Sequence, residues 1–319
     1  MRVLVTGAAG LYGVHLVDEL VKMEEVSRVF GIDDFSREYF QQDPFIKSPQ
    51  FKRKFQLSVR NFYTLTPREL DEMNLDALIH LAAYVSIPDS MRKQYQYFRN
   101  NEYGTFRLVQ SLLKTKNWPQ LIYASTPEVY GSPLYIPIDT NHPLLPRSVY
   151  AVTKLAAEKH CRAMYEWYKY PVVVIRNFNT YGENQDISPH AGVISRFILM
   201  ALKGSPLLVH NTGEQTRDFQ YIKDAVHAYA LILREGKRMV GEIFNIGTGV
   251  QTSIRELAER ILEITGSKSA VKFRPGRCAD LMSLEADCSA IKEKLGWAPQ
   301  CSLEEGLRRT VHWYRRFVG

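Results

Sequence analysis

The sequence predicts an α/β protein, in which a doubly wound parallel sheet is followed by a smaller lobe of mixed strands and helices. Short apolar segments alternate with helical patterns from residue 1 to about 176, a glycine-rich turn follows the first segment, and the pattern loses its regularity beyond residue 177. Such alternation produces right-handed βαβ units and a parallel sheet covered on both faces. We therefore expect a domain of residues 1–176 and a lobe of residues 177–319, with an approximate boundary that the chain is free to recross.

The expected strands are short apolar runs at residues 2–6, 28–32, 54–58, 76–81, 120–125 and 171–176. The expected helices fill residues 11–24, 67–73, 92–115, 148–168, 189–203, 224–234 and 253–265. Thr252 or Ser253 is the expected N-cap of the last helix, with Glu256 in its first turn. The loop from Asp34 to Lys54 is long, polar and rich in aromatic residues, which is typical of functional or mobile loops.

A glycine-rich turn directly follows the first expected strand. The segment TGAAGLYG, from Thr6 to Gly13, has the spacing Gly-x-x-Gly-x-x-Gly, and apolar residues at helical spacing come next. A strand, a turn and a helix N-terminus together present backbone N–H groups and a positive dipole end to a phosphate. Glycines are needed because a Cβ would block the tight turn, the pyrophosphate or the packing of helix on strand. A purely structural turn is the alternative.

The context of this turn favours a Rossmann-type dinucleotide site. A second apolar strand ends at Asp33, twenty positions after Gly13. An acidic group there accepts hydrogen bonds from the adenosine ribose hydroxyls and repels a 2′-phosphate. The sequence therefore predicts NAD rather than NADP as cofactor; the alternative is an Asp33 that only begins the next loop.

Composition and charge are ordinary for a globular protein. The 319 residues are 45% hydrophobic and 24% charged, and 41 basic and 34 acidic side chains give a formal net charge of +7. Apart from Lys52 to Lys54, the basic residues are spread along the chain, so we expect a small anionic substrate and no nucleic acid.

The sequence shows no pattern of a metal site, a disulfide framework or a membrane span. Cys161, Cys278, Cys288 and Cys301 form no Cys-x-x-Cys pair, and the eight histidines lack metal-ligand spacing. No apolar run has the length of a membrane span, and the N-terminus enters a strand at once, which leaves no room for a signal peptide. We expect reduced thiols, no metal, no membrane partner and a cytoplasmic location.

Tyr150 and Lys154 lie four residues apart at the start of an expected helix, and therefore on one helical face. A phenol with a pKa of about 10 is a poor base at neutral pH. A neighbouring ammonium and a positive nicotinamide lower that pKa, and the lysine can also hydrogen-bond the nicotinamide ribose. Tyr-x-x-x-Lys occurs often by chance, but in a chain with a dinucleotide turn it predicts a catalytic pair.

The expected strand at residues 120–125 runs into the segment TPEVYG, from Thr126 to Gly131. A hydroxyl at the carboxyl end of a sheet strand can hydrogen-bond the substrate oxygen that faces Tyr150. Glu128, two residues further on, would reach a carbon acid beside that oxygen. The alternative is that Thr126 and Glu128 only form a turn.

Together these motifs resemble the extended short-chain dehydrogenases/reductases of the nucleotide-sugar epimerase/dehydratase group. The resemblance covers nearly the whole chain, and its motifs occur in the expected order. They are residues 6–13, HLAA at 80–83, STPEVYG at 125–131, YAVTK at 150–154, RNFNTYG at 176–182, QTRDFQY at 215–221 and FNIGTG at 244–249.

The resemblance implies a role for each matched position. The residues that would hold NAD are Gly7, Gly10, Leu11, Tyr12, Gly13, Asp33, Ser58, Val59, Leu81, Ala82, Ala83, Asn101, Tyr150 and Lys154. The residues that would bind a nucleotide-diphosphate sugar are Ser86, Thr126, Asn179, Arg217, Arg274 and Arg277, with the arginines on the diphosphate. Thr126, Glu128, Tyr150 and Lys154 would be catalytic. The helices near 92–115 and 148–168 resemble the pair that builds the family's dimer bundle, so we expect a homodimer.

Two positions depart from the family pattern. Ser58 stands where an Asp usually meets the adenine amine, and Arg277 replaces the Asp of an Arg-Pro-Gly-Asp element that begins at Arg274. Either change can alter the nucleotide preference.

The resemblance also implies a shared first step, in which Tyr150 takes the C4 hydroxyl proton, hydride passes to NAD, and Thr126 holds the resulting 4-keto sugar. Members with small residues after the Ser/Thr return the hydride to the other face, which is 4-epimerisation. Members with Thr-x-Glu use the Glu at C5 and eliminate the 6-hydroxyl, or decarboxylate UDP-glucuronate. Glu128 favours a 4,6-dehydratase, and the segment from Asn177 also resembles the hexosamine-nucleotide dehydratases.

Two other positions bear on this choice. Pro127 stands where thymidine-sugar dehydratases carry an Asp that protonates the leaving hydroxyl, and Glu183 follows Gly182 where a decarboxylase would have a nearby Arg. We therefore expect a nucleotide-sugar 4,6-dehydratase, with a 4-epimerase of the UDP-glucose or UDP-hexosamine type as the alternative and a UDP-glucuronate decarboxylase after it. A non-catalytic dinucleotide-binding protein is disfavoured because Tyr150 and Lys154 are both present.

Overall fold

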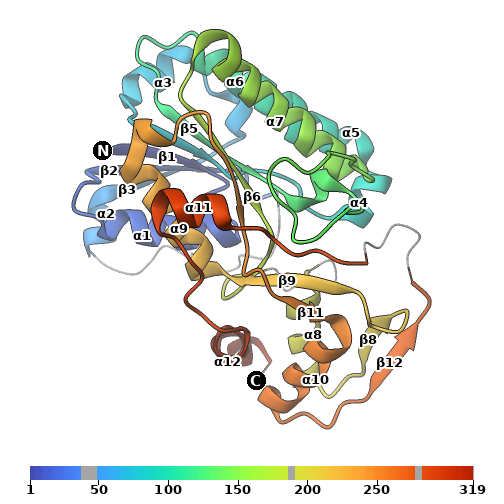
Figure 1. Ribbon diagram of the computed structural model, residues 1–319. Helices are drawn as coiled ribbons and strands as arrows, with labels where there is room; N and C mark the ends of the chain where they lie inside the picture. The colour runs from blue at the N-terminus through green and yellow to red at the C-terminus, as the bar shows by residue number, and fades with distance from the viewer. Residues whose placement is uncertain (37–48, 186–190, 277–281, 319) are drawn as a thin grey trace. The chain divides into compact units, whose positions relative to one another are not determined.

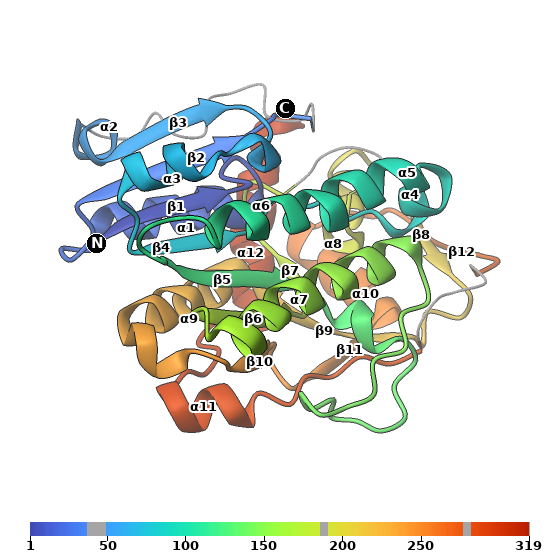
Figure 2. The same ribbon diagram turned by 90° about the horizontal axis from the view of Figure 1, so that it is seen from above.

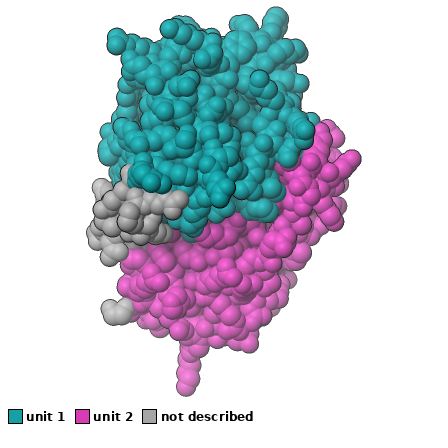
Figure 3. All heavy atoms as spheres, turned by 90° about the vertical axis from the view of Figure 1, so that its left-hand side faces the viewer, with its two compact units in different colours: residues 1–129, 146–176, 226–244 teal, residues 130–145, 177–225, 245–319 magenta. Residues whose placement is uncertain are grey.

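The computed structural model describes residues 1–36, 49–185, 191–276 and 282–318 (Figure 1). The chain forms two compact units, which Figure 3 distinguishes by colour. Unit 1 comprises residues 1–129, 146–176 and 226–244, and unit 2 comprises residues 130–145, 177–225 and 245–319. The expected boundary at residue 176 is one of several points where the chain passes from one unit to the other.

Unit 1 is built on a seven-stranded sheet with the order β10-β6-β5-β4-β1-β2-β3. The strands are β1 (Arg2–Thr6), β2 (Arg28–Asp33), β3 (Phe55–Val59), β4 (Ala77–His80), β5 (Gln120–Ser125), β6 (Val172–Asn177) and β10 (Ile243–Ile246). Strands β1 to β6 pair in parallel. The predicted Rossmann-type fold is confirmed, and each of the six expected strands lies within one residue of its expected bounds. β10 was not expected.

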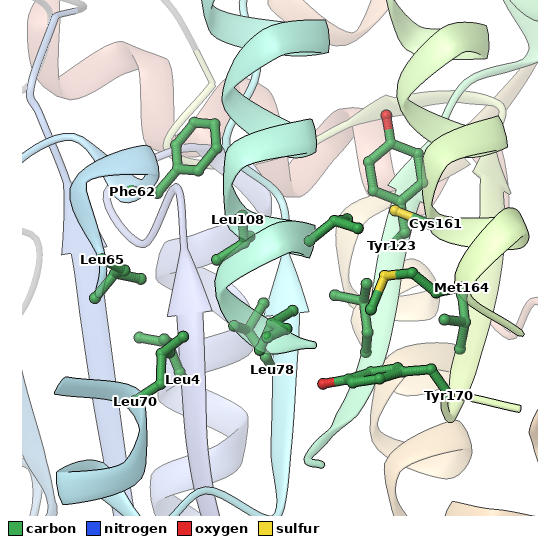
Figure 4. Packing of buried hydrophobic residues seen from close by; sticks show 14 of the residues in the cluster. Leu4, Phe62, Leu65, Leu70, Leu78, Leu108, Tyr123, Cys161, Met164 and Tyr170 are labelled. Atoms are coloured by element: carbon green, nitrogen blue, oxygen red, sulfur yellow. The ribbon is translucent and has the colours of Figure 1, made fainter. Parts of the chain in front are cut away.

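Helices cover both faces of this sheet (Figures 1 and 2). The long helices of unit 1 are α1 (Leu11–Lys22), α3 (Pro67–Met73), α6 (Gly104–Leu112), α7 (Val149–Tyr168) and α9 (Ile222–Glu235), which begins in unit 2. Leu4 and Leu78 of the strands form one core with Leu70 of α3 and Leu108 of α6 (Figure 4). Burial of each such leucine contributes about 1.5–3 kcal/mol.

The expected helix at residues 92–115 is wrong as a single element. The structure has α4 (Ile87–Arg92), α5 (Gln94–Tyr97), a π-helical segment η2 (Phe98–Tyr103) and then α6. Lys93 interrupts the helix with φ −116° and ψ 43°. Gly104 then allows close packing, since a Cβ there would lie 2.8 Å from the Phe62 ring.

Other helix bounds differ less. The expected loop from Asp34 to Lys54 ends in α2 (Pro49–Lys54), and its residues 37–48 lie outside the described part of the chain. The short 3-10 helices are η1 (Phe62–Thr64), η3 (Pro127–Tyr130), η4 (Gly236–Met239) and η5 (Arg315–Phe317).

Among its described residues, unit 2 contains two small sheets and, wholly within it, four α-helices. One sheet has the order β11 (Gln251–Ser253), β9 (Thr216–Tyr221), β7 (Asn179–Tyr181), and the other pairs β12 (Val271–Arg274) with β8 (Leu207–His210). The helices are α8 (Val193–Leu202), α10 (Ile254–Thr265), α11 (Ser289–Leu295) and α12 (Leu303–Tyr314).

Two of these helices were expected and two were not. Ser253 is the N-cap of α10, because its hydroxyl accepts a hydrogen bond from the Glu256 N–H. Helix α8 begins later than expected, and residues 189 and 190 of that prediction lie outside the described ranges. Helices α11 and α12 were not expected. Across the described ranges, every helix is too short or too polar to cross a membrane.

Candidate active site

The carboxyl ends of five parallel strands meet at one edge of the sheet in unit 1. Gly7 follows β1, Asp33 ends β2, Val59 ends β3, Leu81 follows β4 and Thr126 follows β5. Ligands of open α/β sheets bind at this edge. The fold therefore brings most of the predicted cofactor and catalytic residues of unit 1 to one place.

The turn after β1 brings α1 close to the sheet. Gly7 has a φ of +72°, and a Cβ there would lie 2.8 Å from the Ala82 backbone nitrogen. A Cβ on Gly13 would lie 2.1 Å from the Gly7 carbonyl oxygen. These two glycines allow backbone to pack on backbone, and the Ala82 contact places the expected segment Leu81 to Ala83 beside the turn.

Gly10 faces a more open space. Its Cβ would meet only the Gly7 carbonyl oxygen within 4 Å, at 3.3 Å. Gly10 is also the N-cap of α1, and no side chain caps this helix. Leu11 and Tyr12 begin the helix, so its first N–H groups and the positive dipole end adjoin the open side of the turn. This arrangement fits the pyrophosphate of a dinucleotide.

Asp33 connects the end of β2 to this turn. Its carboxylate accepts hydrogen bonds from the backbone N–H groups of Ala9 and Phe35, each at 2.9 Å. Carboxylate oxygens each have a second lone pair, so ribose hydroxyls can still donate to them. Ser58 and Val59 lie beside Ile32 and Asp33 in the sheet register.

His80 connects three elements of unit 1 and was given no role from the sequence. Its Nδ1 lies 2.6 Å from the Thr6 hydroxyl and its Nε2 lies 3.0 Å from the Thr105 hydroxyl. Burial, with a smaller effect of the Lys154 charge, lowers the pKa of His80 to about 3. His80 is therefore a neutral ring that holds β4 against β1 and α6.

Asn101 and Ser86 shape the segment after β4. The Asn101 side chain accepts from the Tyr84 N–H at 2.8 Å and donates to the Tyr84 carbonyl at 2.9 Å. The Ser86 hydroxyl is the N-cap of α4 and accepts from the Asp89 N–H. Both side chains thus have structural partners here, and the Ser86 hydroxyl keeps a proton that it can donate.

Thr126 and Glu128 lie directly after β5. The Glu128 N–H donates to the Thr126 hydroxyl oxygen at 3.3 Å. Thr126 is buried and Glu128 is half-buried in η3. Since the Thr126 oxygen accepts from the backbone, its own O–H proton can be donated to a substrate oxygen.

Tyr150 and Lys154 lie in the first turns of α7, whose N-cap is Ser148. The Lys154 Nζ donates to the Ala124 carbonyl oxygen at 2.6 Å and lies 4.4 Å from the centre of the Tyr123 ring. Burial lowers the pKa of Lys154 to about 7. Tyr150 is 8% exposed. Lys154 is therefore held at the end of β5, where it can hold or release a proton near neutral pH.

The predicted substrate residues Asn179, Arg217 and Arg274 lie in unit 2. Asn179 pairs with Phe219, so it shares a face of its sheet with Arg217, two residues earlier on β9. The Arg217 guanidinium donates to the Thr216 carbonyl at 2.8 Å. Arg274 is exposed on β12, in the other sheet, and Arg277 lies outside the described residues.

Several buried polar atoms of unit 2 have no hydrogen-bond partner among the described residues. They include Asn179 Oδ1, Gln185 Oε1, Ser195 Oγ and both side-chain polar atoms of Gln220. A buried polar atom without a partner is costly, so each of these atoms is a candidate for a contact with a polar ligand. No group of three or more His, Cys, Asp or Glu side chains is placed to hold a metal ion in the described ranges.

Sequence reasoning missed a buried ion pair between α7 and β6. Arg176 Nη2 lies 2.6 Å from Glu158 Oε1, and the two side chains are 2% and 1% exposed. Ser125 donates to Glu158 Oε2 at 2.6 Å. The sequence did offer a signal for Glu158, because it lies four residues after Lys154 and therefore on the same helical face.

The chain is similar to known proteins along nearly its whole length. The sequence model of the family described as GDP-mannose 4,6 dehydratase matches residues 4–310. A UDP-N-acetyl-alpha-D-glucosaminuronate decarboxylase of Bacillus cytotoxicus is 32% identical over 98% of both chains.

Two further relatives differ in their reactions. One is a trifunctional protein of Arabidopsis thaliana, whose first named activity is that of a UDP-glucose 4,6-dehydratase. It is 30% identical, and the match covers 98% of this chain and 47% of that protein. The chain therefore spans about half the length of that relative. The structure of UDP-glucuronic acid 4-epimerase from Bacillus cereus, in complex with UDP-glucuronic acid and NAD, has a TM-score of 0.90 and 28% identity, and the match covers 99% of this chain and 100% of that one.

Proposed function

The chain belongs to the GDP-mannose 4,6-dehydratase family, and from this membership we propose that it is an NAD-dependent nucleotide-sugar 4,6-dehydratase. Its relatives are enzymes that dehydrate, epimerise or decarboxylate nucleotide sugars. The observation that carries the choice among these reactions is Glu128, a half-buried carboxylic acid two residues beyond the Thr126 hydroxyl.

In this proposal the edge of unit 1 holds the cofactor. Gly7, Gly10 and Gly13 leave room for the pyrophosphate at the start of α1, and Asp33 accepts the ribose hydroxyls. When bound, NAD accepts a hydride from the sugar and later returns it. The Lys154 side chain, fixed by the Ala124 carbonyl, adjoins the nicotinamide ribose in this assignment.

The chain's own residues handle the protons. Tyr150 removes the proton of the C4 hydroxyl, and the nearby lysine charge favours the phenolate that does so. Thr126 donates its hydroxyl proton to the C4 oxygen, which stabilises the ketone. The ketone acidifies the C5–H bond, and Glu128 removes that proton as the 6-hydroxyl leaves. Glu128 or a water supplies the proton with which the hydroxyl leaves as water, because Pro127 has none to donate. The hydride would then return to C6, and C5 would take a proton from the solvent.

In this assignment, residues of unit 2 bind the nucleotide diphosphate. Arg217 and Arg274 bind its phosphate oxygens, since a guanidinium presents a fork of donors. The Asn179 Oδ1 atom, buried without a partner among the described residues, accepts from the sugar nucleotide. Arg277 adds a further cation to the same task.

A 4-epimerase is the second candidate, and Pro127 favours it. Elimination of the 6-hydroxyl needs an acid, and a prolyl side chain cannot replace the Asp that related dehydratases use. In an epimerase Glu128 would not be needed as a base, and the 4-keto sugar would rotate before the hydride returns.

Product analysis separates the candidates. Purified protein with NAD is incubated with a panel of nucleotide-diphosphate sugars in D₂O, and the products are identified by NMR. A dehydratase gives a 4-keto-6-deoxy sugar that carries deuterium at C5, whereas an epimerase gives the C4 epimer without it. Tyr150→Phe is the control that should abolish both. No conversion of any sugar by a protein that binds NAD would contradict the proposal.

We also propose that the enzyme is a homodimer built on α4 to α7. These elements carry a set of exposed apolar side chains, namely Met91, Tyr95, Phe98, Tyr103, Phe106 and Val152. A second copy would bury this face as a helix bundle. Light scattering should give twice the chain mass, Val152→Glu should shift it toward the monomer, and Val250→Glu, at another exposed valine, should not. A monomeric wild-type protein would contradict this.

A further inference from the structure

One face of α7 is connected to three consecutive residues of β5. The Tyr123 hydroxyl donates to the Lys154 carbonyl at 3.3 Å, and the Lys154 Nζ donates to the Ala124 carbonyl at 2.6 Å. The Ser125 hydroxyl donates to Glu158 at 2.6 Å. The next residue is Thr126. The end of β5 is therefore held residue by residue up to the position of the catalytic hydroxyl.

Glu158 is the last residue of α7 in this set of contacts, and it forms an ion pair with Arg176 of β6. Arg176 donates to both carboxylate oxygens, from Nη2 to Oε1 at 2.6 Å and from Nε to Oε2 at 3.2 Å. Both side chains are almost fully buried. A buried carboxylate is retained only when it is paired and hydrogen-bonded, which this one is.

We propose that Glu158 is a positioning residue, which keeps Lys154 charged and holds the end of β5, while Arg176 makes its burial possible. This inference rests on the proposed function for its catalytic consequence, but its effect on Lys154 is independent of any reaction. Tyr150, Lys154 and Glu158 follow one another at intervals of four residues, so the carboxylate lies along the same helical face as the lysine.

The charges around Lys154 support this role. Burial lowers the pKa of Lys154, and the Cys161 thiol and, to a smaller extent, the Glu158 carboxylate act to raise it. Burial also raises the pKa of Cys161 far above its usual range, so this thiol is uncharged at neutral pH and Glu158 is the effective anion.

Three other titratable groups around Lys154 and Glu158 are uncharged or paired. His80 of β4 is neutral because burial lowers its pKa to about 3. Burial raises the pKa of Tyr123 of β5 well above 10, with smaller effects of Cys161, Glu158, Tyr150 and Tyr229 of α9. Arg176 of β6 pairs with Glu158, and of this pair it is the carboxylate that acts on the pKa of Lys154. Without the carboxylate, the interior around the lysine would favour the neutral amine.

The direct test is the titration of Lys154 in the protein without substrate. Lysine labelled with ¹³C at Cε is followed by NMR as a function of pH, and Lys154→Met assigns the signal. Glu158→Gln keeps the shape and the acceptor for Ser125 but removes the charge, so the titration midpoint should fall by roughly one pH unit, a tenfold change in the ratio of ammonium to amine. Ser125→Ala removes a hydrogen bond without changing charge, and its midpoint should stay at the wild-type value.

A second variant covers the case in which Glu158→Gln fails to fold. Glu158→Gln combined with Arg176→Met also removes the carboxylate but leaves no unpaired guanidinium in the interior. Its Lys154 midpoint should fall as well. A wild-type midpoint in every folded variant that lacks the carboxylate would overturn the inference.

The steady-state kinetics of Glu158→Gln provide a second test. At neutral pH kcat of Glu158→Gln should fall about tenfold with little change in KM, and it should recover as the pH is lowered and the ammonium re-forms. If Glu158→Gln lowered kcat only by disturbing the structure, kcat would not recover at lower pH. If the NMR midpoint moves but the wild-type protein converts no nucleotide sugar, the proposed function fails while the role of Glu158 toward Lys154 stands.

Discussion

The backbone N–H of Glu128 donates a hydrogen bond to the hydroxyl oxygen of Thr126, at 3.3 Å. This contact fixes the carboxylic acid and the hydroxyl in one turn at the end of β5. It also leaves the hydroxyl proton of Thr126 for a substrate oxygen. Thr126, which would act during oxidation at C4, and Glu128, which would remove the C5 proton, are therefore neighbours in the chain. Substitution of one or the other should separate the two steps.

Glu128→Gln should retain the first half of the reaction and lose the second. The glutamine keeps its backbone contact with Thr126, so the 4-keto sugar still forms. Without a carboxylate base, exchange of the C5 proton should slow by about 10²–10⁴-fold. NMR measurement of deuterium incorporation at C5 checks this, with Glu128→Asp as the variant that keeps the carboxylate. Exchange at the wild-type rate in Glu128→Gln would refute the assignment.

Asp33→Asn should weaken NAD binding by roughly tenfold and reduce the preference for NAD over NADP. The amide loses the charge that repels a 2′-phosphate, and it cannot accept hydrogen bonds from the Ala9 and Phe35 N–H groups with both of its terminal atoms. Isothermal titration with both dinucleotides gives the two affinities. Asp34→Asn removes the same charge one residue away and should change neither, so equal effects of the two variants would mean that Asp33 has no specific role.

The sheet was largely predictable because its strands are strongly apolar and lie between clear turn signals. The six expected strands and the glycine turn are local patterns. β10 was missed because Ile243–Ile246 is a four-residue strand with no pattern to distinguish it from the segments around it. The break at Lys93 was also missed, since the polar and apolar residues around it remain compatible with a continuous helix.

The site was predictable only where a motif carries the chemistry. The glycines, Tyr150 and Lys154 belong to short spaced motifs, so they can be recognised in sequence. The pairing of Glu158 with Arg176, and of His80 with Thr6, joins segments 18 and 74 residues apart. Such contacts depend on the register of the sheet and on the helix that covers it, which a single sequence does not specify.

His80 should make the unfolding free energy depend on pH in a defined window. Burial lowers its pKa from 6.5 to about 3 in the folded protein. Between these values the unfolded chain binds a proton that the folded chain does not, so stability is present above pH 6.5 and is lost as the pH falls toward 3. The contribution of His80 to the slope should approach about 1.4 kcal/mol per pH unit.

Urea unfolding at a series of pH values measures this slope. His80→Gln keeps a polar side chain but cannot take up the proton, so its slope in the window should be smaller by that amount. Carboxylates titrate in both proteins, and their contribution cancels in the difference. Equal slopes in the two proteins would show that the ring is not held neutral.

Gly13→Ala should impair folding, whereas Gly10→Ala should fold and impair cofactor binding. A Cβ at position 13 would lie 2.1 Å from the Gly7 carbonyl oxygen, which is backbone and cannot move without opening the turn. Gly13→Ala should therefore destabilise the protein by more than about 3 kcal/mol. A Cβ at position 10 meets only the same oxygen at 3.3 Å, so Gly10→Ala should fold.

The folded Gly10→Ala protein should nevertheless bind NAD at least about tenfold more weakly, because its methyl group occupies the space that the pyrophosphate needs. Thermal unfolding reports the first effect and titration with NAD reports the second. Gly204→Ala is the control for backbone strain alone, since Gly204 has a φ of +67° and no atom within 4 Å of its Cβ position. Its cost in stability should be about 1–2 kcal/mol, and its NAD affinity should equal that of the wild type. Wild-type NAD affinity in Gly10→Ala would place the pyrophosphate elsewhere than at the start of α1.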